Sequence, residues 1–99
     1  MSSVGGKEEF WHMRLYVAGP SAKSRRALAN LTNLCEEHLR GRHKIEVIDL
    51  ARHPMQARTD NILAIPTLVR RLPTPMQKFI GDLSNTEHVL VELRLGESE

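Results

Sequence analysis

The stretch "AIPTLVRRLPTP", residues 64–75, decides how the second half of this sequence is interpreted. Its Pro66 precedes "TLVRRL", a run of apolar and β-branched residues that is typical of a strand. The link Pro73-Thr74-Pro75 is too rich in proline for a two-residue hairpin turn. We therefore predict two strands, "IPTLVRRL" and "MQKFIG", joined by a longer, hairpin-like link.

Upstream of this stretch, the sequence predicts a strand followed by a helix. In "HMRLYVAG" the apolar residues Met13, Leu15 and Val17 alternate with their neighbours, which is the period of a strand. Ser21 can cap a following helix, and Gly41 is placed to end it. The apolar residues of this helix recur with a period of 3.6 and are Ala27, Leu28, Leu31, Leu34, Cys35 and Leu39.

Between this helix and Pro66, we predict a buried strand in "HKIEVIDLA" and a shorter helix in "HPMQARTDNILA", with Pro54 in its first turn. The whole order is then βαβαββα, a mixed sheet with helices on both faces. A chain of 99 residues makes one domain, which we place at residues 11–99 after a flexible lead-in at residues 1–10.

The last segment carries two signals that conflict. Ser84 and Glu87 have the spacing of a capping box, which predicts a helix. The strict alternation of apolar residues after them instead predicts a strand. The alternating apolar residues are Val89, Val91, Leu93 and Leu95. Signals that disagree in this way leave two packings close in energy.

The predicted layout is similar to the thioredoxin-like fold, in which a proline placed like Pro66 stands beside a Cys-x-x-Cys pair. Here "GPSA", residues 19–22, occupies the position of that pair, and Cys35 is the one cysteine of the chain. Dithiol exchange therefore has no mechanism. Pro66 is either a strand-edge proline or a cis proline, and the thioredoxin-like layout favours cis.

Several motifs together resemble the KaiB family: "LYVAG", "VIDL", "ILAIPTL" and, most specifically, "PTL" at residues 66–68 with "IGDLS" at residues 80–84. The resemblance runs from about Arg14 to Leu95. It implies a protein without enzymatic activity that binds the N-terminal ATPase ring of a hexameric KaiC-type ATPase. It also implies a metamorphic fold: a self-associating βαββααβ form, dimeric or tetrameric, and a thioredoxin-like form that engages KaiC, with the halves dividing near Ala51.

Two residues depart from the pattern of the cyanobacterial relatives, which carry a glycine and an aspartate where this chain has Glu92 and Arg94. Glutamate favours a helix over glycine by on the order of 0.5 kcal/mol, and a basic residue suits the last helical turn. We therefore expect Pro66, Ser84, Glu87, Glu92 and Arg94 to influence the choice of fold, and the thioredoxin-like form to prevail at rest. The contact residues of a KaiA-type partner are not recognisable, so that partner is left open.

Basic residues suggest where an acidic partner would bind. Lys23, Arg25 and Arg26 lie in the first turns of a helix, where the macrodipole disfavours cations, so helix stability does not explain them. We predict that Lys23 and Arg26 face the partner together with Arg14, Arg70 and Lys78, which the resemblance to KaiB supports most at Arg26 and Lys78. The alternative is an ordinary solvated face.

Other classes of function are less well supported. A thioredoxin-type redox protein or chaperone lacks its thiols, and Cys35 is expected to be a buried packing residue. A stand-alone KaiB-like sensor domain of a histidine-kinase system remains an alternative, although no kinase follows residue 99.

Four aromatic residues leave little for nucleic-acid stacking, and the five histidines have no ligand spacing, so we expect no metal and no cofactor. We find no apolar run of roughly 20 residues and no signal peptide, and we expect a cytoplasmic protein.

Overall fold

The computed structural model describes residues 9–93. Its elements, in chain order, are β1 (Trp11–Val17), α1 (Ala22–His38), β2 (His43–Asp49), the 3-10 helix η2 (Pro54–Arg58), β3 (Thr67–Leu72), β4 (Gln77–Ile80) and α2 (Thr86–Leu93). The sheet order is β2-β1-β3-β4, with β1 and β2 parallel and the other pairs antiparallel. The predicted mixed sheet is confirmed, and so is the predicted order of strands and helical segments along the chain.

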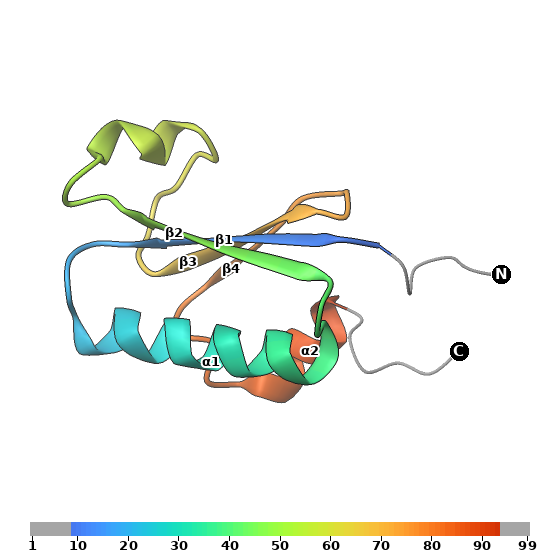
Figure 1. The fold of residues 1–99 in the computed structure, drawn as a ribbon. Helices are drawn as coiled ribbons and strands as arrows, with labels where there is room; N and C mark the ends of the chain where they lie inside the picture. Colours follow the sequence, from blue (N-terminus) through green and yellow to red (C-terminus); the bar gives the residue numbers. More distant parts are fainter. Residues whose placement is uncertain (1–8, 94–99) are drawn as a thin grey trace, which may run out of the picture.

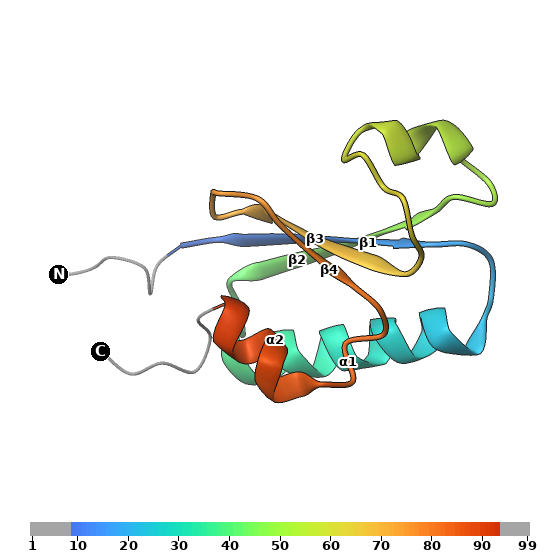
Figure 2. The same cartoon turned by 180° about the vertical axis from the view of Figure 1, so that it is seen from behind.

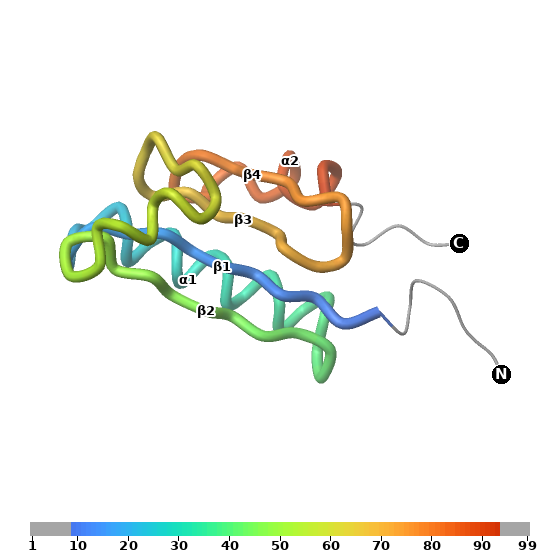
Figure 3. Tube along the Cα trace, turned by 90° about the horizontal axis from the view of Figure 1, so that it is seen from above, coloured from blue at the N-terminus to red at the C-terminus, as the bar shows by residue number. Residues whose placement is uncertain are grey.

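The helices cover the sheet unequally (Figures 1 and 2). α1 and α2 lie on one face, called here the helix face. The segment that contains η2 lies on the opposite face, called here the outer face. Seen from above, α1 runs beneath β1 and β2, while α2 lies beside β4 (Figure 3). The prediction of helical segments on both faces is therefore confirmed, although the two α-helices share one face.

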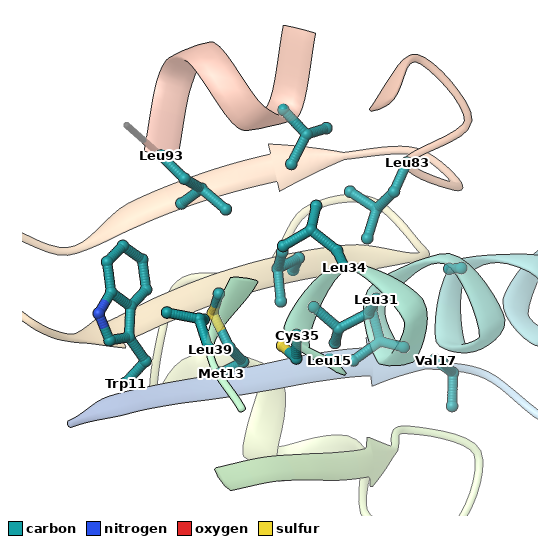
Figure 4. Close-up of a cluster of buried hydrophobic side chains, with 13 residues drawn as sticks. Trp11, Met13, Leu15, Val17, Leu31, Leu34, Cys35, Leu39, Leu83 and Leu93 are labelled. Carbon is teal, nitrogen blue, oxygen red and sulfur yellow. The ribbon is translucent and has the colours of Figure 1, made fainter. Parts of the chain in front are cut away.

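The core lies between the sheet and the two α-helices (Figure 4). Met13 and Leu15 of β1 point toward α1 and are completely buried with Leu31 and Cys35. α1 begins as predicted, since the Ser21 hydroxyl accepts a hydrogen bond from the Ser24 amide at 3.0 Å. Burial of these apolar side chains is the main source of stability of such a small domain.

Two predictions about residues 43–62 are wrong. β2 is an edge strand and not a buried one, and Val47 remains 45% exposed because only β1 flanks it. The predicted shorter helix is a five-residue 3-10 helix without a buried residue. A short α-helix is stable in a protein when one of its faces packs against apolar side chains. In this segment no side chain is buried, and Met55 is 63% exposed.

The hairpin follows the prediction. β3 pairs with β4 from Thr67, opposite Ile80, to Arg70, opposite Gln77. The peptide bond before Pro66 is cis, as favoured from the sequence, and those before Pro73 and Pro75 are cis as well.

The conflict in the last segment is decided in favour of a helix. Val89 and Leu93, four residues apart, are both buried, whereas Val91 between them is 70% exposed. Its cap, however, differs from the prediction: Asn85 Oδ1, and not the Ser84 hydroxyl, accepts the hydrogen bond of the His88 amide, at 3.2 Å. The helix starts one residue later than the predicted box, so Glu87 lies two residues after the capping Asn85 and not three residues after a capping Ser84. Arg94 lies outside the described residues.

Candidate partner-binding surface

The turn before α1 stands where a thioredoxin carries its cysteine pair, and here it is a structural turn. Gly19 adopts a positive φ of 69°, and its amide donates to Asp49 Oδ1 at 2.9 Å. Asp49 also accepts from the Ala51 amide at 3.0 Å, and these two backbone donors lower the pKa of the Asp49 carboxyl. Ser21 is occupied in capping α1. The turn therefore positions the start of α1 and offers no nucleophile.

The first turns of α1 present the exposed cations predicted from the sequence. Arg26 Nε lies 3.1 Å from Asp82 Oδ2, in the connection between β4 and α2, yet its side chain is still 59% exposed. The hydrogen bonds from Ser84 and from Arg26 lower the pKa of Asp82. Lys23 is exposed and makes no ion pair within residues 9–93. Charge is thus available to a partner at this end of α1.

Arg14 is not available in the same way. Its side chain lies on the outer face, 14% exposed, with Nε 3.0 Å from Glu46 Oε1 and Nη1 3.6 Å from Asp60 Oδ2. His12 Nε2 lies 2.9 Å from the same Glu46 oxygen. Burial raises the pKa of Glu46, but the hydrogen bonds from His12 and Arg14 outweigh burial and lower it. Arg14 therefore serves an internal ion-pair network.

Asp60 is the centre of this network, and the sequence analysis did not single it out. Its side chain is 1% exposed, and it accepts from the Tyr16 hydroxyl at 2.8 Å and from Arg71 Nη1 at 3.1 and 3.2 Å. Burial raises the pKa of Tyr16; the hydrogen bond from Arg14 opposes this, and the hydrogen bond to Asp60 adds to it. The one sequence signal for this role is that Asp60 is the single acidic residue between positions 52 and 78.

Arg70 and Lys78 lie elsewhere. The Arg70 guanidinium lies 5.3 Å from the centre of the Trp11 ring and donates to the Pro75 carbonyl at 2.6 Å, on the helix face. Burial lowers its pKa. Lys78 lies on the outer face, where its Nζ donates to the Asn61 carbonyl at 3.2 Å. Of these two residues, Lys78 is exposed and accessible to a partner, whereas Arg70 is buried.

The five predicted partner-binding residues therefore do not form one patch. Lys23 and Arg26 lie at the start of α1. Arg14 and Lys78 lie on the outer face, and Arg70 lies beside Trp11, at the other end of β1.

The remaining reactive side chains offer no redox or metal chemistry within the described part of the chain. Burial raises the pKa of Cys35 to about 12, so its thiol stays protonated, and its predicted burial is confirmed. Among residues 9–93, no three His, Cys, Asp or Glu side chains are grouped as metal ligands. Over the same residues, the structure contains no helix that could cross a membrane.

Comparison with known proteins identifies the family. A family model described as "KaiB domain" matches residues 14–95. The chain belongs to the KaiB family. Among its KaiB relatives, the circadian clock protein KaiB3 of Synechocystis sp. is 43% identical over 81 residues, which are 82% of this chain and 79% of that protein. The circadian clock oscillator protein KaiB of Microcystis aeruginosa is 48% identical over 83 residues, 84% of this chain and 80% of that protein.

Solved structures show that this KaiB chain has a thioredoxin-like fold. The N-terminal domain of Synechococcus elongatus SasA superposes with a TM-score of 0.70 at 16% identity, over 100% of this chain and 98% of that one. Chloroplastic thioredoxin z superposes with a TM-score of 0.67 at 19% identity, over 87% and 80% of the two chains. At these identities, the likeness concerns the fold alone.

Proposed function

We propose that this chain is a non-enzymatic regulatory protein of a clock or timing system, acting in the cytoplasm. It binds the N-terminal ATPase ring of a KaiC-type hexameric ATPase and modulates that enzyme's phosphorylation and ATPase cycle. The observation that carries the proposal is the KaiB match across residues 14–95, together with relatives named as circadian clock proteins. A thioredoxin-type redox function is disfavoured because the one thiol is buried with a pKa of about 12.

The start of α1 supports the proposal on physical grounds. No acidic residue lies in the first turn of α1, so Lys23 and Arg26 both oppose the helix macrodipole, and of the two Arg26 alone has a carboxylate partner, Asp82, among the described residues. Exposed cations that do not serve the helix are suited to an acidic partner, and their attraction is screened over about 8–10 Å at ordinary ionic strength. We place the main charge contact at these two residues, with Lys78 as a second contact. Arg14 and Arg70, which the sequence also suggested, are held by partners inside the fold and are not proposed as direct contacts.

We further propose that the thioredoxin-like form engages the ATPase, and that a self-associating form, dimeric or tetrameric, is its alternative. Pro66, Ser84, Glu87, Glu92 and Arg94 are the residues proposed to set the balance between the two forms. A few kcal/mol between two packings is enough to change which of them dominates. A KaiA-type partner is not part of the proposal.

Native mass spectrometry with a cognate KaiC, across its nucleotide and phosphorylation states, tests the function. We expect several copies of this chain to add to the KaiC hexamer in at least one state. Absence of a complex in every state would contradict the proposal.

The same measurement on variants tests the contact surface. Lys23→Glu and Arg26→Glu should weaken binding roughly tenfold or more, because a like charge replaces an attraction. Lys44→Glu makes the same charge change at the beginning of the edge strand β2, near the end of α1 that is opposite to Lys23 and Arg26, and is the matched control. Equal binding by all three variants would return Lys23 and Arg26 to an ordinary solvated face.

A further inference from the structure

The segment of residues 51–65 crosses the outer face of the sheet with very little apolar packing. Asp60 is the one buried residue in this range, all of which the structure describes. The apolar side chains of Met55 and Leu63 are 63% and 90% exposed. A segment with so few buried contacts belongs to the least stable part of a fold.

The backbone of this segment does not attach it to the sheet. Its backbone hydrogen bonds outside the helices and strands join its own residues to one another or to Asp49, as from the Ile62 amide to the Ala57 carbonyl at 2.8 Å. The links to the strands are polar and come mainly through Asp60, which Tyr16 of β1 and Arg71 of β3 both hold. Two further hydrogen bonds reach its C-terminal part: Lys78 Nζ donates to the Asn61 carbonyl, and the Thr67 hydroxyl donates to the Ala64 carbonyl.

The outer face of the sheet carries two completely buried side chains. Tyr16 of β1 and Val69 of β3 are completely buried, although they alternate with the residues that face the helices. The cartoon places residues 51–65 over this outer face (Figures 1 and 2). Because the Tyr16 hydroxyl donates to Asp60 of the segment, movement of the segment away from the sheet would expose that end of the Tyr16 side chain.

We propose that residues 51–65 form a strap that the buried carboxylate of Asp60 locks onto the outer face, and that the strap opens as a local unit when this lock is broken. If the buried carboxylate of Asp60 loses its charge, Arg71 loses its carboxylate partner and Arg14 keeps Glu46 alone, so the main links between the segment and the strands are lost together. The sheet and the two α-helices stay folded during opening, because their apolar core lies on the opposite face. The inference does not depend on the proposed function.

Hydrogen exchange of the native protein tests the strap, with Asp60→Asn as the principal variant. Exchange within residues 51–65, including the Ile62 amide, should become about tenfold faster or more, while α1 and β1 to β4 keep their protection. Trypsin should also cleave faster after Arg58, an exposed residue of the strap. Glu46→Gln is the matched control, because Glu46 shares Arg14 with Asp60 but does not touch the strap.

Tyr16→Phe provides a milder variant that leaves Asp60 paired with Arg71. It should give the same strap-limited pattern at smaller size, a few-fold faster exchange. The proposal is overturned if exchange in the strap is unchanged in Asp60→Asn and Tyr16→Phe. It is also overturned if β1, α1 and the strap gain exchange equally, since Asp60 would then support the whole fold.

Discussion

The two faces of this sheet are closed by different physical means. On the helix face, Leu15 and Leu68 meet the apolar sides of α1 and α2, and the contacts are non-directional. On the outer face, Tyr16 and Arg71 donate hydrogen bonds to Asp60, which belongs to a segment without a buried apolar side chain. Packing of the first kind weakens gradually as methyl groups are removed, whereas a buried ion network fails sharply when one partner is lost. A small domain can therefore be stable as a whole and still have one face that opens.

The largest difference between the faces should appear on removing apolar volume. Leu31→Ala in α1 should lower the free energy of unfolding by about 2–5 kcal/mol, because it leaves a cavity in the core. Leu63→Ala in the strap should change it by less than about 0.5 kcal/mol, because that side chain is 90% exposed. Urea denaturation measures both, and equal effects would show that the strap packs more tightly than its exposure indicates.

The cap of α2 tests how the helix face is completed. Asn85→Ala should cost about 0.5–2 kcal/mol, since it removes the acceptor of the His88 amide. Ser84→Ala should cost less, because the Ser84 side chain lies before the cap. The free energies of unfolding of the two variants show which residue caps α2. A larger loss in Ser84→Ala than in Asn85→Ala would support the capping box predicted from the sequence.

The interior of α2 gives a smaller effect. Glu92→Gly should cost about 0.5–1 kcal/mol of helix stability at an exposed position, and Glu92→Ala provides the control. NMR chemical shifts over residues 86–93 would report whether the helix persists. Strand-like shifts, in this variant or in its combination with Arg94→Asp, would support the proposed second fold; helical shifts in both would argue against it.

The smallest effect concerns pH and the outer face. Burial raises the pKa of Glu46, but the hydrogen bonds from His12 and Arg14 outweigh it, so its pKa is lower in the folded state than the ordinary 4.5. The stability it contributes is present above about pH 4.5 and is lost as the pH falls through the lower, folded-state pKa. Glu46→Gln should therefore flatten the acid limb of a stability profile by less than about 1 kcal/mol. An unchanged acid limb would show that Glu46 adds nothing to the outer face.

Much of the fold could be predicted from local signals. The alternation of Met13, Leu15 and Val17 and the cap at Ser21 were recognisable, because each depends on a few neighbouring residues, whereas the cis Pro66 was expected from the thioredoxin-like layout. The edge position of β2 was not, since an apolar strand looks alike at an edge and in the centre of a sheet. The candidate site was predicted less well: Lys23 and Arg26 are exposed as expected, but Arg14 and Arg70 are largely buried.

The sequence by itself determined the order of elements up to β4, the family resemblance and the absence of a cysteine pair, because these are properties of neighbouring residues and their spacing. Only the tertiary structure decided that α2 is a helix capped by Asn85, since burying Val89 and Leu93 together outweighs an alternating pattern that also fits a strand. It alone decided the role of Asp60 as well. Its partner Tyr16 lies 44 residues away, and a buried carboxylate is stable only where the fold brings its donors together.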